Sequence, residues 1–331
     1  MLEIGGGGGK AAPPFAAAGR AWYKRRTMRI LVLSRKRTLF TTRRLVEAAR
    51  AEGHEAAVAD PLSCWLVCGK GAPHIYYKSD RRKVSEVDVV LPRIGSSITD
   101  YGLAVVNQFE MMGIPVVNSS AAIRRSRDKL QTLQFLSRHD IDIPKTVIAR
   151  GPGQIQAALR VVGGPPVVLK LLQGTQGIGV MLAETQEGLE SILHTVWSLG
   201  HNLLIQEFVA ESRGRDIRAL VVGGRVVAAM KRIAPLGQFR SNIHRGGSGR
   251  VVHLSPEYER AAVESARIME LEVAGVDLLE SRRGPKVVEI NSSPGFEGLE
   301  KATGADIAGA IVRHTISRSD SRARPVPAVR S

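Results

Sequence analysis

The chain has 331 residues and a formal net charge of +16, from 47 lysines and arginines against 31 aspartates and glutamates. This length allows two or three domains with hydrophobic cores of their own, and the longest apolar runs are far too short to span a membrane. The excess positive charge predicts attraction to a polyanion such as a nucleotide, an acidic peptide or RNA, although a solvated basic surface explains it equally well.

Both ends of the chain are expected to be disordered. Residues 1–27 contain the five-glycine run Gly5–Gly9 and the basic group Lys24-Arg25-Arg26, without hydrophobic periodicity. The continuous apolar core of a secretory signal is missing from this segment. Met28, which opens the first strand pattern, is a candidate alternative start. The tail, residues 319–331, is arginine-rich and contains two prolines.

Strand and helix patterns alternate in the next part of the chain. The strand patterns are Met28–Leu33, Val87–Leu91 and Val116–Val117, and the helical spacings are Thr42–Glu52 and Tyr101–Met112, each followed by a glycine. This alternation predicts a parallel sheet covered by helices, in a domain over residues 28–120. Its two cysteines, Cys64 and Cys68, have no companion ligands, which favours free thiols in a reduced cytoplasm.

The rest of the chain is typical of an α+β fold with antiparallel sheets. Helices are predicted over Arg127–Arg138, with Ser126 as N-cap, Gln186–Leu199 and Pro256–Leu271. Strands are predicted over Val167–Lys170, Val180–Ala183 and Leu203–Glu207. Ile217–Val222 and Val226–Met230, joined by two glycines, predict a hairpin.

A second hairpin, Val273–Asn291, carries three oxygen ligands. Because side chains alternate along a strand, Glu289 and Asn291 point the same way, and a turn centred on Arg283 places Asp277 opposite Glu289. Two carboxylates so close repel each other unless a cation lies between them. Oxygen ligands without His or Cys suit Mg²⁺ or Mn²⁺, and such ions usually also bind nucleotide phosphates. A hairpin with solvated acids is the alternative.

A lysine and a glycine-rich loop precede this hairpin. Lys170 ends an apolar strand and therefore needs an anionic partner such as a phosphate, unless its ammonium reaches solvent. The loop Gly174–Gly179 lies between two strands, unlike nucleotide loops that run from a strand into a helix. Its glycines allow close approach of the backbone to a phosphate, and an ordinary turn is the alternative.

Further candidates lie between that loop and the second hairpin. Glu207 and Phe208 follow a strand and suit an adenine pocket, and Asp216 suits ribose hydroxyls. Arg232 and the stretch Arg240–Gly247 offer the cationic donors that phosphoryl transfer needs. Taken singly, Glu207, Phe208 and Asp216 are better explained as a core Phe and two surface acids, and a basic surface loop explains the arginine stretch equally well.

In this order the segments resemble the ATP-grasp superfamily, and more closely the RimK-type α-L-glutamate ligases, from about Met28 to Arg318. The matching segments include Leu91-Pro-Arg-Ile-Gly95, Arg127-Asp-Lys129, Gly174-Thr-Gln-Gly-Ile-Gly-Val180, Phe239-Arg-Ser-Asn242, His244-Arg-Gly-Gly247 and Asn291-Ser-Ser-Pro-Gly295. The resemblance implies an ATP-grasp fold, α/β and α+β, with an N-terminal parallel-sheet pre-ATP-grasp domain. It also implies a small lobe over residues 121–205 and a large lobe over residues 206–318.

The resemblance implies a role for each candidate. The expected ATP-binding residues are Lys129, Lys170, Gly174, Gly177, Gly179, Glu207, Phe208, Asp216, Arg240, Ser241 and Asn242. The expected metal ligands are Asp277, Glu289 and Asn291, for two ions of Mg²⁺ or Mn²⁺, and the expected catalytic residues are Arg232 and Arg240. Ile233 and Leu236 stand where the family has charged residues, which puts acceptor preference in doubt.

The implied reaction is ATP-dependent addition of L-glutamate, through an acyl-phosphate and in α-linkage, to the C-terminus of ribosomal protein number six of the small subunit. The expected setting is cytoplasmic, with a homo-oligomeric enzyme, possible ribosome association and no membrane. One alternative keeps the fold and joins an amino acid to a small-molecule carboxylate. The other is an RNA- or ribosome-binding protein with a vestigial ATP site, for which the charge of +16 is the main support.

Overall fold

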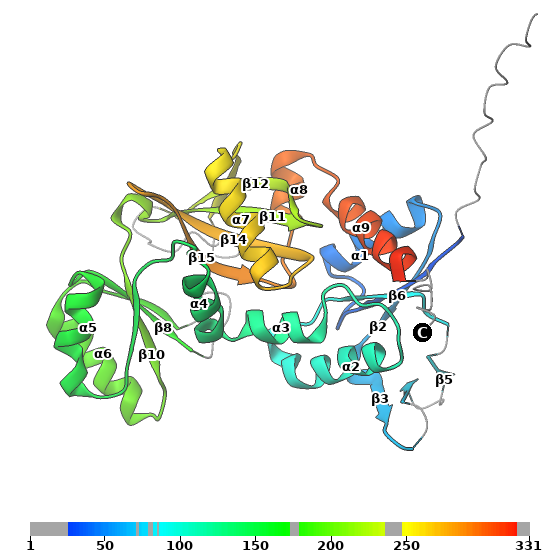
Figure 1. The fold of residues 1–331 in the computed structure, drawn as a ribbon, viewed down its shortest axis with the longest axis horizontal. Helices are drawn as coiled ribbons and strands as arrows, with labels where there is room; N and C mark the ends of the chain where they lie inside the picture. Colours follow the sequence, from blue (N-terminus) through cyan, green and yellow to red (C-terminus); the bar gives the residue numbers. More distant parts are fainter. Residues whose placement is uncertain are drawn as a thin grey trace, which may run out of the picture.

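The computed structural model describes residues 26–70, 73–78, 82–84, 86–172, 179–235 and 247–322. The described part contains four β-sheets. Figure 1 shows the small lobe around β8 and β10 at one end of the molecule, the N-terminal domain around β1, β2 and β6 at the other, and the large sheet between them. None of the described helices is long and apolar enough to cross a bilayer.

The N-terminal domain contains the predicted parallel sheet. Its order is β2-β1-β6, with β1 Arg29–Leu33, β2 Glu55–Ala59 and β6 Val89–Pro92, and its helices are α1 Phe40–Ala51 and α2 Thr99–Met111. A small antiparallel sheet joins β3 Cys64–Val67, β4 His74–Tyr77 and β5 Arg82–Lys83. The third predicted strand, Val116–Val117, is only a bridge from Val116 to Val90.

Strand β1 is buried on both faces. Ile30 and Val32 face a core shared with α1, while Leu31 and Leu33 face the core beneath α2. Such two-sided burial is the reason that this strand appears as a continuous apolar run in the sequence.

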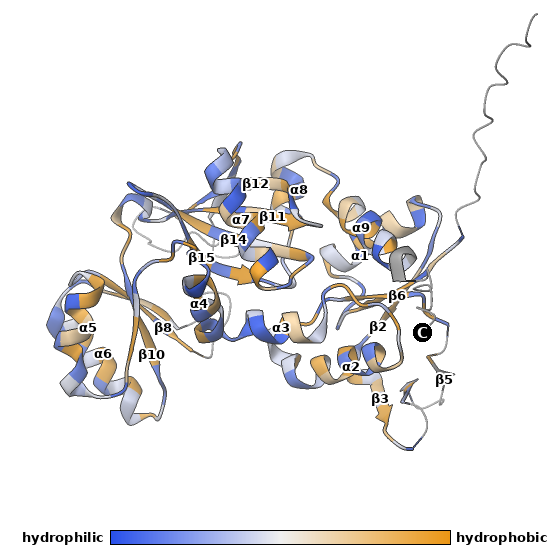
Figure 2. Cartoon of the chain, viewed as in Figure 1, coloured by the Kyte–Doolittle hydropathy of each residue, from blue (hydrophilic) through white to orange (hydrophobic). Residues whose placement is uncertain are grey.

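Two helices replace the single one predicted between the N-terminal domain and the small lobe. They are α3 Ser120–Arg127 and α4 Lys129–Arg138. The N-cap of α4 is Asp128, whose carboxylate accepts from the backbone N–H of Gln131, and Ser126 lies inside α3. The predicted cap was therefore wrong by two residues. In Figure 2 the last turn of α3, which carries three arginines, is hydrophilic.

The small lobe has a core of its own. Its antiparallel sheet has the order β7-β10-β8-β9, with β7 Thr146–Ala149, β8 Val167–Leu171, β9 Val180–Ala183 and β10 Leu203–Glu207. Helices α5 Ile155–Val162 and α6 Gln186–Ser198 pack their apolar residues on this sheet.

The large sheet has the order β13-β12-β11-β14-β15. The strands are β11 Arg215–Val222, β12 Arg225–Ile233, β13 Ser248–Val251, β14 Val273–Ser281 and β15 Gly284–Asn291. Helix α7 Pro256–Ile268 covers one face. Residues of the other face share a core with α8 Glu297–Thr303, α9 Ile307–Arg322 and the N-terminal sheet.

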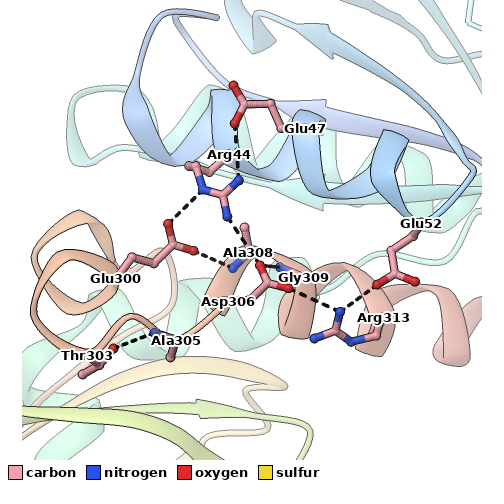
Figure 3. Close-up of polar contacts among 10 residues, drawn as sticks. All are labelled: Arg44, Glu47, Glu52, Glu300, Thr303, Ala305, Asp306, Ala308, Gly309 and Arg313. Atoms are coloured by element: carbon pink, nitrogen blue, oxygen red, sulfur yellow. Dashed lines mark hydrogen bonds and ion pairs between the residues drawn. The ribbon is translucent and has the colours of Figure 1, made fainter.

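The C-terminal helix α9 returns to the N-terminal domain and packs beside α1 (Figure 1). It extends past Ser319, where the disordered tail was expected to begin, and Ser319 is buried, with its hydroxyl donating to the backbone carbonyl of Asp88. Figure 3 shows the polar contacts of this junction. They join Arg44, Glu47, Glu52, Glu300, Asp306 and Arg313.

Candidate active site

The hairpin β14–β15 carries the three predicted metal ligands, and its predicted register is confirmed. Asp277 pairs with Glu289, and Gly275 pairs with Asn291. The turn is centred between Arg282 and Arg283 rather than on Arg283, because Ser281 pairs with Gly284. A bulge between Asp277 and Leu278 makes up the difference and restores the pair of carboxylates. Asp277 is buried, Asn291 is partly buried and Glu289 is exposed.

A glycine allows the chain after Asn291 to fold back over this hairpin. A Cβ atom at Gly275 would lie 2.8 Å from the Cβ of Pro294 and 3.8 Å from that of Asn291. Any side chain at this position would therefore displace Pro294 or the end of β15. The small residue at Gly275 keeps the predicted ligand Asn291 in register with its partner strand.

Asp277 belongs to a buried cluster of four charged side chains, Asp277, Arg218, Arg232 and Asp216, here called the Asp277 cluster. Arg218 donates to both oxygens of Asp277 at 2.6 and 2.5 Å, and Arg232 donates to both oxygens of Asp216 at the same two distances. Arg232 also lies 2.9 Å from Asp277. The cluster thus joins a predicted metal ligand, catalytic arginine and ribose ligand.

The electrostatics of this cluster keep Asp277 ionised. Burial alone would raise the pKa of Asp277, but the charges of Arg218 and Arg232 outweigh burial and hold it below its usual value. Likewise burial alone would lower the pKa of Arg232, and Asp277 and Asp216 together raise it instead. A carboxylate that is ionised and oriented before a cation arrives is suited to metal binding.

Sequence reasoning did not find Arg218. Its position in an apolar strand was a signal, but its partner is known only once β11 pairs with β14, which places Arg218 opposite Asp277. Arg232 remains a catalytic candidate. Its Nε and Nη2 atoms bind aspartates, whereas its Nη1 atom has no hydrogen bond within the described residues and is the group left to reach a phosphoryl oxygen.

Two lysines, Lys129 at the start of α4 and Lys170 in β8, interact electrostatically with the same hairpin. Burial lowers the pKa of Lys170 to about 8, and the charge of Lys129 acts in the same direction, while the carboxylates of Glu289 and Asp277 oppose it. Burial also lowers the pKa of Lys129, against the charge of Glu289. The Lys129 ammonium donates to the backbone carbonyl of Leu171 at 2.9 Å, which ties α4 to the end of β8. The structure therefore brings both lysines into the field of Glu289.

The glycine-rich loop joins two antiparallel strands, β8 and β9, as predicted. Gly179 closes it, with its carbonyl accepting from the Leu171 N–H at 2.8 Å. Its φ is +79°, and a Cβ would lie 2.5 Å from the Leu171 side chain, so only glycine fits. Gly174 and Gly177 lie outside the described residues, as do Arg240, Ser241 and Asn242.

The predicted adenine and ribose contacts lie at the end of β10 and the start of β11. Glu207 accepts from the backbone N–H of Lys145 at 2.9 Å, and its carboxylate lies 3.7 Å from the ammonium of Lys286. The Phe208 ring lies 5.9 Å from the guanidinium carbon of Arg213. Both oxygens of Asp216 are engaged by Arg232, so a ribose would have to share this carboxylate.

The donors present fit a hard divalent cation. The cross-strand pair Asp277 and Glu289 supplies two carboxylates, and Asn291 at the end of β15 supplies an amide oxygen. A cation would have to share the Asp277 carboxylate with Arg218 and Arg232. In the described part of the chain, no three His, Cys, Asp or Glu side chains are grouped so that they could hold a metal, so a site here depends on Asn291 as the third donor. Oxygen-only donors next to two lysines are typical of a site that binds a metal together with nucleotide phosphates.

Comparison with known proteins identifies the family of this chain. The chain matches the family model of the RimK-like ATP-grasp domain over residues 126–315 and that of the RimK PreATP-grasp domain over residues 28–123. The chain belongs to the RimK-like ATP-grasp family. It is an ATP-dependent carboxylate–amine ligase, as the resemblance implied.

Relatives of this ATP-grasp chain match most of its length. A probable alpha-L-glutamate ligase of Aliivibrio fischeri is 53% identical over 285 residues, which cover 86% of this chain and 94% of the relative. One of Methanococcoides burtonii is 52% identical over 287 residues, covering 87% and 95%. The RimK domain ATP-grasp protein of Sphaerobacter thermophilus superposes with a TM-score of 0.67 at 26% identity, covering 87% of this chain and 99% of that one. The ATP-grasp ligase PsnB, complexed with a variant precursor, Mg and ADP, shares the fold, with a TM-score of 0.67 at 20% identity over 88% and 99% of the two chains.

Proposed function

We propose that this ATP-grasp ligase adds L-glutamate by α-linked amide bonds to the C-terminus of ribosomal protein number six of the small subunit. The observation that supports the proposal is the pairing of Asp277 with Glu289 in the hairpin, with the charges of Lys170 and Lys129 interacting with Glu289. Glutamate as the added amino acid is supported by relatives with 52–53% identity that bear the name alpha-L-glutamate ligase. The net charge of +16 suits an acidic, growing tail and association with the ribosome, in the cytoplasm.

The chemistry of the step follows from the weakness of a carboxylate as an electrophile. A carboxylate oxygen of the acceptor attacks the γ-phosphorus of ATP, and ADP leaves, which forms an acyl-phosphate. The amine nitrogen of glutamate then attacks the carbonyl carbon, phosphate leaves, and the amine loses a proton as the amide forms. Positioning supplies most of the catalysis in such a reaction.

The chain's own residues divide this work. Lys170 and Lys129 bind the phosphates, and Glu207, Phe208 and Asp216 hold the nucleoside. Asp277, Glu289 and Asn291 would hold two ions of Mg²⁺ or Mn²⁺, whose charge would offset that of the phosphate oxygens. Arg232, through its Nη1 atom, and Arg240 steady the transferring phosphoryl group.

The decisive experiment is mass spectrometry of ribosomal proteins from cells with and without this gene. Serial mass steps of one glutamyl residue on one small-subunit protein, present only with the gene, are expected. In vitro, the purified chain should add glutamate to that protein with release of phosphate. If only a small metabolite supports phosphate release, the acceptor proposed here is incorrect and the small-carboxylate alternative replaces it.

A Glu289→Gln variant separates the ligase from a binding protein with a vestigial site. Glu289 is exposed and makes no ion pair within the described residues, so this change should leave stability within about 0.5 kcal/mol of wild type. Turnover should fall below detection, because the metal site loses a ligand charge. Normal glutamylation and growth of cells carrying Glu289→Gln would favour the binding-protein alternative.

A further inference from the structure

Two arginines from different elements meet beside the active-site hairpin. Arg93 directly follows β6, at the carboxyl edge of the parallel sheet, and Arg127 ends α3. The Arg93 Nη2 atom donates to the backbone carbonyl of Pro294 at 2.5 Å, and the Arg127 Nη2 atom donates to that of Ile94. Both guanidinium groups therefore lie at the junction of the N-terminal domain with the segment that follows β15.

These two arginines lack the carboxylates that such groups usually have. Neither makes an ion pair with any residue that the structure describes, and the Nε atoms of both are buried without a hydrogen-bond partner. The hydroxyl of Ser293, on the same segment as Pro294, is also buried and unpaired. By contrast, Arg218 and Arg232 each bind a carboxylate through two atoms.

The arrangement is costly without an anion. Burial, with the like charge of Arg127, lowers the pKa of Arg93 to about 10. Burial also lowers the pKa of Arg127, and the charge of Glu289 acts against it. Two partly buried cations that repel each other, with donors left unsatisfied, are expected to bind an anion that enters with a ligand.

The position of the pair identifies which step it serves. Pro294, which Arg93 binds, packs against Gly275, and Gly275 is the register partner of Asn291. Arg127 lies in the field of Glu289 on the same hairpin. An anion bound by the pair would therefore lie beside the predicted metal ligands. The proposed phosphate ligands are Lys170 and Lys129, so a second anion of the reaction is the better match for the two arginines.

We propose that Arg93 and Arg127 form a carboxylate-binding subsite, which holds a substrate carboxylate that is not itself activated. This inference rests on the proposed glutamate ligation. Two sources share that chemistry: the incoming glutamate, whose two carboxylates do not react, and the side chain of the last glutamate already on the acceptor. A guanidinium fork binds both oxygens of a carboxylate, and Ser293 offers a hydroxyl donor beside it.

The test compares Arg93→Met and Arg127→Met with the matched control Arg124→Met. Arg124 lies on α3 with Arg127, but it is exposed and makes no hydrogen bond or ion pair within the described residues. L-glutamate, tri-glutamate and inorganic phosphate are titrated by calorimetry into each full-length protein loaded with Mg²⁺ and a non-hydrolysable ATP analogue. Weakening of roughly 10- to 100-fold is expected for a glutamate probe in both variants, because each loses charged hydrogen bonds. Arg124→Met should bind like wild type, and the affinity for the nucleotide should not change in any variant.

The outcomes separate the two sources and the two proposals. Weakened L-glutamate binding assigns the subsite to the incoming amino acid, and weakening of tri-glutamate alone assigns it to the acceptor tail. The subsite is overturned if wild type binds neither probe, if the variants bind both as Arg124→Met does, or if only phosphate binding changes. The protein could also bind glutamate through the two arginines and yet ligate it to no peptide. That result would overturn the proposed acceptor but support the subsite. Arg93→Lys keeps a charge and should recover part of the affinity, and it replaces Arg93→Met if that variant does not fold.

Discussion

Two ionic groups in this chain have similar composition and opposite surroundings. The junction of α1 with α8 and α9 joins Arg44, Glu300, Asp306, Arg313 and Glu52 (Figure 3), and most of these side chains are between 27% and 54% exposed. The side chains of the Asp277 cluster are between 7% and 15% exposed. Exposed ion pairs contribute little net stability. Buried ion pairs make a protein hardly more stable than apolar residues of the same volume would.

The difference shows what each group is for. The junction holds together helices from the two ends of the chain, whose main contact is the apolar core they share. The Asp277 cluster lies on neighbouring strands that are already joined by backbone hydrogen bonds. It is not needed to hold the sheet together. Its charges are best explained by the ionised, oriented carboxylate that they provide for the active site.

The largest stability effect is expected from Asp277→Asn. The change leaves Arg218 and Arg232 facing a neutral group in a buried place, and breaking such a pair costs about 3–5 kcal/mol. Urea unfolding of the ligand-free protein measures this loss. The control is Asp142→Asn, since Asp142 also pairs with a cation, Lys286 at 3.0 Å, but is 48% exposed. A loss below about 1 kcal/mol is expected there, and equal losses in the two variants would contradict the distinction.

The uncharged side chain of Asn118, from the N-terminal domain, binds the backbone at both ends of the same hairpin. Its removal should have the next largest effect on stability. The buried Asn118 amide donates to the carbonyls of Val273 and Ser292 and accepts from the N–H groups of Glu272 and Val273. Asn118→Ala leaves these backbone groups unsatisfied, at an expected cost of about 2–4 kcal/mol by urea unfolding.

Asn107→Ala, on the exposed side of α2, is the control and should change stability by less than about 0.5 kcal/mol. A loss for Asn118→Ala as small as that of its control would show that the hairpin is held by its own strands alone. The same result would mean that the burial of a polar side chain does not predict how much its removal destabilises the protein.

Local patterns explain which of these features the sequence predicted. The hairpins β11–β12 and β14–β15 follow from alternation and glycine turns, so the pair Asp277–Glu289 was found correctly. The strand β2 was missed because Glu55–Ala59 is rich in alanine, a weak strand former. Arg218 and Asn118 were missed for another reason. Their partners lie 59 and about 155 residues away, and no local spacing reports such pairings.

Lys170 tests the electrostatics of the site through pH, with a smaller expected effect. With a pKa of about 8 in the free protein, its ammonium is charged below that pH, and Lys170 itself adds no pH dependence to the affinity for ATP there. Above pH 8 the free lysine is neutral, and bound phosphate must draw in a proton, so Kd should rise by up to about tenfold per pH unit. Calorimetry of ATP binding measures this profile. Lys170→Gln should bind more weakly with a flatter profile, and an affinity of wild type that stays constant above pH 8 would rule out the lowered pKa.

The smallest effect is expected from Arg313→Met at the α1–α9 junction. Arg313 lies 2.7 Å from Glu52 and 3.4 Å from Asp306, yet its side chain is 49% exposed, so the loss should be about 0.5 kcal/mol. Salt at about 1 M should remove that difference, because the Debye length then falls to about 3 Å. Arg44→Met should cost more, since it deprives Glu300, which is only 9% exposed, of its partner at 2.9 Å. Urea unfolding at low and high salt measures both. The contrary result is that Arg313→Met lowers the free energy of unfolding as much as Asp277→Asn does, with no reduction of that loss by salt. Burial would then not determine how much each ionic group contributes to stability.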